Sequence, residues 1–110
     1  MKIIIDAMGG DNAPQAQIEG AVKAINDFDV DIVFVGKENV IKKELSKYEY
    51  PHKRVEIVNA DEVITNHEEP AKAVRSKKNS SIVVAANLLK NGGGDALLAC
   101  GNTGALLAAG

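Results

Sequence analysis

Four short apolar runs that alternate with helical patterns constrain the fold of this chain most strongly. The first three runs are rich in β-branched residues, which are stiff at χ1 and suit strands that are buried on both faces. The predicted strands cover residues 3–5, 32–35, 55–58 and 95–100. Strands that alternate with helices imply a parallel sheet with right-handed crossovers and helices on both faces. We therefore predict a doubly wound, Rossmann-like α/β fold in a single domain that covers residues 1–110.

The segments between these runs carry apolar residues with the period of a helix. Pro14 suits the first turn of the first helix, and Asn12 with Gln15 resembles a capping box. The stripe of this helix is Ile18, Ala21, Val22, Ile25 and Phe28. A short second helix has Ile41, Leu45 and Tyr48 on one face.

The segment from 59 to 79 is irregular, and we expect a long loop with a short helix that begins at Pro70. Ser80 can cap the next helix, and Asn91 with the following three glycines supplies a left-handed stop. A further helical pattern begins at Thr103 and is cut by the end of the sequence. We therefore expect the fold to be truncated at its C-terminal end and the chain to be the N-terminal part of a longer protein.

Two glycine turns are the candidate chemical sites. If the strand order is the common 3-2-1-4, the turns after the first and fourth strands form two lips of one crevice at the carboxyl edge of the sheet. The turn at 101–104 joins a strand to a helix N-terminus, where N–H groups favour an anion such as phosphate. It could equally be a tight connection with Asn102 or Thr103 as the N-cap. The chain has neither the dinucleotide fingerprint nor a Walker loop, which argues against an NAD enzyme or an ATPase.

The turn after the first strand contains Gly9 and Gly10, which permit close approach of the backbone to a ligand, between Asp6 and Asp11. These carboxylates could orient a cation, act as a base or bind a metal, and orientation is the favoured role. A plain turn or cap residue is an equal alternative for Asp11. Two aspartates without further ligand spacing are weak evidence for a metal, so we predict none.

A basic cluster lies between the two turns. Arg75, Lys77 and Lys78 suit phosphate, or the anionic groups of an acidic carrier protein, and could also be a solvated charge run. Cys100 ends an apolar strand, so a small buried hydrophobe is favoured over a nucleophile. His52 and His67 lie in polar loops and offer no zinc spacing.

The composition excludes several classes of protein. A formal charge of −2 argues against a nucleic-acid binder, which normally has a basic face. A single cysteine fits a reducing cytoplasm. The sequence shows no signal peptide and no apolar stretch long enough to span a bilayer, so we expect a cytoplasmic location.

Three segments resemble, in the right order, the signature segments of the PlsX-type phosphate acyltransferases. They are residues 6–11 with the following Ala13 and Pro14, residues 73–81, and residues 101–105. The resemblance spans the whole chain, and proteins of this family are considerably longer. It implies transfer of a fatty acyl group from acyl-acyl-carrier-protein to inorganic phosphate, which gives acyl phosphate for phospholipid synthesis. Carrier protein and phosphate would be the partners, with no cofactor. The full-length protein would form a homo-oligomer, a dimer, and peripheral contact with the membrane through regions absent from this chain stays open.

The resemblance also assigns candidate roles to residues. The catalytic candidates are Asp6, Asp11 and Asn102. The candidates for phosphate or substrate binding are Gly9, Gly10, Arg75, Lys77, Lys78, Ser80, Gly101, Thr103 and Gly104. Phosphate needs no strong base, so catalysis would rest on positioning and on stabilisation of the oxyanion.

Other functions remain open on the sequence alone. One alternative is another phosphate-using α/β enzyme, such as a phosphate acetyltransferase or a metal-dependent dehydrogenase. Another is a non-catalytic module that binds a phosphate ligand or a carrier protein. We expect the chain by itself to have little or no transferase activity, because the family's remaining residues must complete the pocket.

Overall fold

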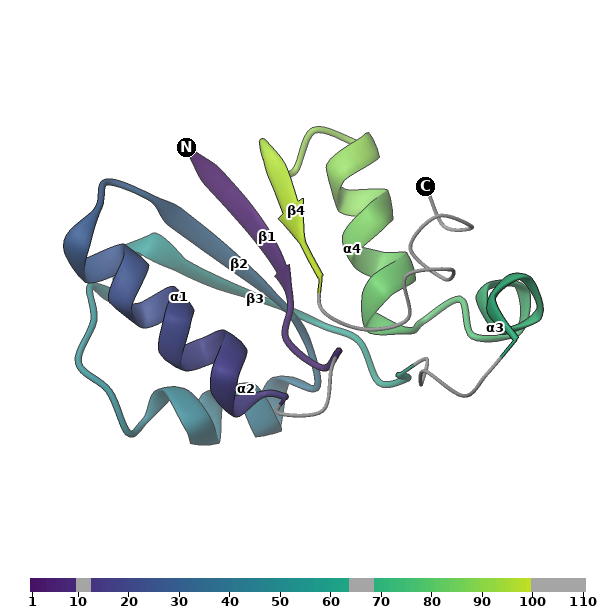
Figure 1. The fold of residues 1–110 in the computed structure, drawn as a ribbon, viewed down its shortest axis with the longest axis horizontal. Coiled ribbons are helices and arrows are strands. Elements are labelled where there is room, and N and C mark those ends of the chain that lie inside the picture. The colour runs from purple at the N-terminus through teal and green to yellow at the C-terminus, as the bar shows by residue number, and fades with distance from the viewer. Residues whose placement is uncertain (10–12, 64–68, 100–110) are drawn as a thin grey trace.

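The computed structural model of the chain describes residues 1–9, 13–63 and 69–99. Four parallel strands form one sheet in the order β3-β2-β1-β4, which confirms the predicted strand order (Figure 1). The elements in chain order are β1 (Lys2–Asp6), α1 (Gln15–Asp27), β2 (Asp31–Gly36), α2 (Glu38–Leu45), the 3-10 helix η1 (His52–Arg54), β3 (Val55–Asn59), α3 (Pro70–Ser76), α4 (Ser81–Lys90) and β4 (Ala96–Leu98).

Helices cover both faces of the sheet, as the alternation of patterns predicted (Figure 1). Successive side chains of a strand point to opposite faces, so β1 serves two cores. Ile5 packs with residues of α1 and α2, whereas Ile4 packs with Ala85 of α4. The predicted doubly wound α/β architecture is thereby confirmed for the part of the chain that the structure describes.

A third, smaller cluster joins α3 to the beginning of α4. Ala73 of α3 packs on Ile82 and Val83 in the first turn of α4. The predicted short helix at Pro70 and the predicted Ser80 cap are both confirmed. Gly92 has φ of +80°, which confirms the left-handed stop after α4.

Some local predictions are wrong. Phe28 is not part of the buried stripe of α1: it is the C-cap residue, its backbone is extended, and it is 69% exposed. The capping box at Asn12 is also wrong, because α1 begins at Gln15 with Pro14 at the N-cap and no side-chain cap. Asn12 itself lies outside the described residues.

Two predicted elements are shorter than the patterns indicated. The second helix ends at Leu45, before Tyr48, although Tyr48 still packs against the core. The fourth strand covers Ala96–Leu98 only, and Cys100 lies outside the described residues. None of the described helices is long and apolar enough to cross a membrane.

Candidate active site

The carboxyl ends of β1 and β4 lie side by side. Ile5 pairs with Leu98 of β4 on one side and with Phe34 of β2 on the other. The segments that follow β1 and β4 therefore leave the sheet from neighbouring positions at the same edge. The turn after β1 is anchored there, since the amide of Ala7 donates to the carbonyl of Val35 at 3.0 Å.

The adjacency of β1 and β4 is the requirement for the predicted crevice between the two glycine turns. Gly9, which lies at this edge, is buried. Gly10, Asp11 and residues 101–104 lie outside the described residues, so the roles of Gly101, Asn102, Thr103 and Gly104 stay predictions.

Asp6 is the buried carboxylate of this edge. It ends β1 and is 3% exposed. Its Oδ1 accepts a hydrogen bond from the amide of Met8 at 3.1 Å. Burial raises the pKa of Asp6 above its ordinary value of 3.8, and hydrogen bonds from the Ser81 side chain and from the amides of Met8 and Gly9 act in the opposite direction. The carboxylate thus holds the glycine turn and the start of α4 together.

Ser81 is a residue of this site that the sequence prediction missed. It is the first residue of α4 and is 1% exposed. Its amide donates to the carbonyl of Glu62 at 2.9 Å, and its side chain is hydrogen-bonded to Asp6. The available signal was a second serine directly after the capping Ser80, because one helix needs only one N-cap residue.

Ser80, a predicted phosphate ligand, is fully buried. Its Oγ accepts a hydrogen bond from the amide of Val83 at 3.4 Å, so the hydroxyl caps α4. Its backbone forms an isolated parallel bridge with Glu62. The capping role accounts for this serine without a ligand, and its contact with phosphate stays a prediction.

The three predicted cations have different surroundings. Lys77 is half-buried, and its Nζ donates to the carbonyl of Val63 at 3.1 Å. Arg75 and Lys78 are exposed. Lys77 therefore anchors the segment between α3 and α4, while the other two cations face solvent.

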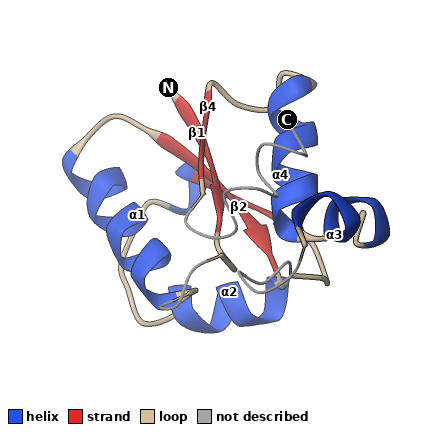
Figure 2. Cartoon of the chain, turned by 45° about the vertical axis from the view of Figure 1, so that its right-hand side comes forward, coloured by secondary structure: helices blue, strands red, loops and turns tan. Residues whose placement is uncertain are grey.

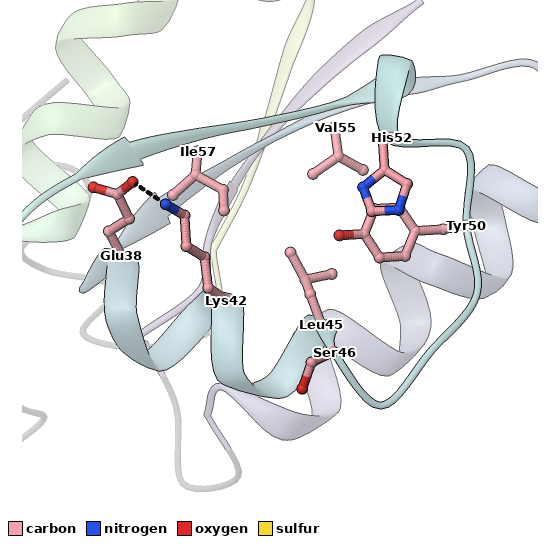
Figure 3. Close-up of a pocket in the computed structure, with 8 residues that line it drawn as sticks. All are labelled: Glu38, Lys42, Leu45, Ser46, Tyr50, His52, Val55 and Ile57. Atoms are coloured by element: carbon pink, nitrogen blue, oxygen red, sulfur yellow. Dashed lines mark ion pairs between the residues drawn. The ribbon is translucent and has the colours of Figure 1, made fainter.

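A hollow of about 530 Å³ lies elsewhere, between α2 and β3 (Figure 3). Figure 3 shows Leu45 of α2 pointing across it toward Val55 and Ile57 of β3. At its rim Lys42 forms an ion pair with Glu38 at 2.8 Å. No predicted site residue lines this hollow, and β2 separates β3 from β1.

The described residues include no group of three or more His, Cys, Asp or Glu side chains that could hold a metal ion. The donors at the carboxyl edge are instead backbone amides and a serine hydroxyl, arranged around one buried carboxylate. This arrangement can order a turn and a helix start, which is a task of positioning.

Fold and site together define a doubly wound α/β domain whose candidate chemistry lies at the carboxyl ends of β1 and β4. The chain matches the family described as fatty acid synthesis protein over residues 1–110, and it belongs to this family. The resemblance to the PlsX-type phosphate acyltransferases is thereby confirmed.

Curated relatives agree with this assignment. The chain is 54% identical over 110 residues to a phosphate acyltransferase of Clostridioides difficile strain 630, with all of this chain and 32% of the relative covered. It is 48% identical over 110 residues to a phosphate acyltransferase of Alkaliphilus oremlandii strain OhILAs. This match covers 100% of this chain and 33% of the relative. It is 51% identical over 111 residues to a phosphate acyltransferase of Enterococcus faecalis strain ATCC 700802 / V583. This match covers 100% of this chain and 32% of the relative. The chain thus spans about a third of the length of these relatives.

Proposed function

We propose that the complete protein transfers a fatty acyl group from acyl-acyl-carrier-protein to inorganic phosphate and so supplies acyl phosphate for phospholipid synthesis. Relatives named phosphate acyltransferase support an acyl transfer that involves phosphate. The structural observation that carries the proposal is the pairing of β1 with β4, which starts both glycine turns from adjacent positions. The backbone amides of two turns that follow adjacent strands would suit the oxygens of a phosphate ion.

The proposed reaction is a direct transfer. An oxygen of hydrogen phosphate attacks the thioester carbonyl carbon, and the tetrahedral intermediate collapses with cleavage of the carbon–sulfur bond. The pantetheine thiolate leaves and takes up the proton that the phosphate group gives up. Gly9, Gly10, Gly101, Thr103 and Gly104 would bind phosphate through the backbone amides of the two turns. Asp11 would orient substrate, and the amide group of Asn102 would donate to the oxyanion.

Asp6 would act through the turn rather than on the substrate. Its carboxylate accepts from the Met8 and Gly9 amides and is hydrogen-bonded to Ser81. Those contacts fix where the glycine turn begins relative to α4. A small displacement of a positioning group costs a large factor in rate, so Asp6 should affect turnover although it is buried.

The test is turnover by the complete protein, with acyl-acyl-carrier-protein and inorganic phosphate as substrates. Acyl phosphate is trapped with hydroxylamine as the hydroxamate, and the pantetheine thiol that the carrier protein releases is quantified in the same reaction. We expect equal amounts of both products, and we expect Asp6→Asn to lower kcat by about tenfold or more, which is about 1.4 kcal/mol in the barrier.

Asp27→Asn is the matched control, because Asp27 is an exposed residue at the end of α1. It should leave kcat unchanged. If the folded wild-type protein yields neither hydroxamate nor thiol, the proposed function is wrong. If Asp6→Asn is as active as Asp27→Asn, the function stands and the positioning role of Asp6 does not.

A further inference from the structure

Positive charge is concentrated in one part of this acidic chain. Five of its 13 Lys and Arg residues lie between Pro70 and Gly94, a segment with no Asp or Glu, whereas the remainder carries all 15 acidic residues. Such an asymmetry within one domain produces a local positive potential that the net charge of −2 hides.

The α3 region presents part of this charge to solvent. Lys72 and Arg75 lie three residues apart in α3, which places them on the same side of the helix, and Lys78 follows in the turn before α4. All three are exposed, and no ion pair with a described carboxylate involves them. We define Lys72, Arg75 and Lys78 as the α3 cationic surface.

The nearest described carboxylate in sequence does not neutralise this surface directly. The side chain of Glu69 is turned to the start of α3, where it accepts from the amides of Ala71 at 3.3 Å and Lys72 at 2.6 Å. Lys77, which lies between Arg75 and Lys78 in sequence, donates to the Val63 carbonyl. The fold therefore uses Lys77 for anchoring and leaves the three cations of the α3 cationic surface facing water.

The α3 cationic surface lies beside the candidate active site. α3 packs through Ala73 on Ile82 and Val83, in the first turn of α4. The first residue of α4, Ser81, is hydrogen-bonded to Asp6 at the carboxyl end of β1. Figures 1 and 2 both show α3 next to this end of α4. A partner bound on α3 would thus be close to the edge where acyl transfer is proposed.

The character of the surface favours an acidic protein over a lipid bilayer. Surface-lying membrane helices insert large apolar side chains below the headgroups. The large hydrophobic residues that are exposed in the described part of the chain are Met1, Phe28, Val40 and Leu98, and none of them lies between Pro70 and Gly94. Cations without an apolar wedge suit the carboxylates of a folded partner.

We propose that the α3 cationic surface docks the acidic face of the carrier protein that delivers the acyl thioester. This inference rests on the proposed function, and it assigns Arg75 and Lys78 to the carrier rather than to the phosphate ion. Complementary charge at such a surface speeds encounter and fixes the orientation of the partner, and its effect falls with salt.

The experiment compares two triple variants of the complete protein with the same change in charge. The test variant carries Lys72→Glu, Arg75→Glu and Lys78→Glu. The control carries Lys23→Glu, Lys43→Glu and Lys53→Glu, three exposed lysines outside the basic segment. Circular dichroism verifies that both variants are folded. KM is then measured for acyl carrier protein, for phosphate and for a small acyl-pantetheine thioester, at low and high salt.

We expect the test variant to raise KM for the carrier by roughly tenfold or more, with KM for phosphate and for the small thioester unchanged. Added salt should raise the carrier KM of the wild type and have much less effect on the test variant. The control variant should match the wild type in all three constants.

Other outcomes would overturn the proposal. A rise in the phosphate KM equal to that for the carrier would make these cations phosphate ligands. An unchanged carrier KM would reject docking, and if binding to phosphatidylglycerol-containing vesicles is lost in the same variant, the surface faces lipid. If the wild type makes no acyl phosphate, the proposed function fails. Docking can then still be tested by titrating the purified proteins with unacylated carrier protein. Binding by the wild type that is lost in the test variant supports docking, and equal binding by both proteins rejects it.

Discussion

Ser81→Ala should destabilise the fold by an amount that grows with pH. Ser81 is 1% exposed, and its hydroxyl is hydrogen-bonded to the Asp6 carboxyl group. A hydrogen bond to an ionised group contributes about 1.5–3 kcal/mol to stability, and a bond between neutral groups about 0.5–1.5 kcal/mol. The substitution should therefore cost about 1.5–3 kcal/mol where Asp6 is ionised and about 0.5–1.5 kcal/mol where it is protonated.

The sign of the pH dependence follows from the pKa of Asp6. Burial raises this pKa in the folded protein above the unfolded value of 3.8. The folded state therefore binds the proton more tightly, and the stability that Asp6 contributes is complete below 3.8 and is lost as pH rises through the folded pKa. The hydrogen bond from Ser81 lowers the pKa and limits this loss. Its removal raises the pKa further, so the loss becomes larger and extends to higher pH.

Urea unfolding at about pH 3 and about pH 8 measures both costs. Ser80→Ala is the matched control, since Ser80 is equally buried, adjacent in sequence and bonded to the Val83 amide. Loss of that cap should cost about 0.5–2 kcal/mol at either pH, because an amide does not titrate in this range. The reasoning is refuted if the Ser81→Ala cost stays constant or falls with pH, or if Ser80→Ala shows the same rise.

Two further predictions concern packing and the route of the acyl group. A Cβ at Gly94 would lie 2.7 Å from Cγ1 and 2.8 Å from Cδ1 of Ile4, so Gly94→Ala should cost about 1–3 kcal/mol in urea unfolding. Gly20→Ala is the control, because a Cβ at this helical position meets nothing within 4 Å, and it should raise the free energy of unfolding by about 0.5–1 kcal/mol. Equal stabilities of the two variants would contradict the predicted clash at Gly94. In the complete protein Cys100→Ser should keep most of the activity, because in the proposed reaction phosphate attacks the thioester directly and no acyl group passes through a cysteine. An inactive Cys100→Ser variant, together with an acyl group found on wild-type Cys100 by mass spectrometry, would overturn the direct mechanism.

The strand order and the layers could be predicted from sequence because they follow from burial. A run such as 32–35, apolar at every position, is typical of a strand covered on both faces. The stripe from Ile18 to Ile25 requires one helix face on a core. The spacing of apolar residues predicts burial less well at the ends of helices and strands. Phe28 continued the stripe of α1 in sequence, yet the helix ends before it and the extended backbone directs Phe28 into water.

The contacts of the candidate site could not be predicted in the same way. The hydrogen bond between Asp6 and Ser81 joins the end of β1 to the start of α4, which most of the chain separates in sequence, so no local pattern encodes it. The cluster of Arg75, Lys77 and Lys78 was visible as three charges, but only the fold distinguishes them. Lys77 reaches the Val63 carbonyl, whereas Arg75 and Lys78 are exposed.

Asp6 shows why stability alone does not explain this edge of the sheet. Asp6 is 3% exposed, and burial of its carboxyl group disfavours the ionised form and so raises the pKa. A neutral residue of similar size would avoid that cost, so a purely structural role gives no reason for an acid here. A carboxylate, however, can accept from Met8, Gly9 and Ser81 together, which one amide oxygen does less well. The order that it imposes on the glycine turn and on the start of α4 is what the proposed phosphate site requires. Asp6→Asn should therefore separate the effect of Asp6 on turnover from its effect on stability. Turnover should fall, whereas the free energy of unfolding at about pH 8 should fall less than it does in Ser81→Ala, or rise.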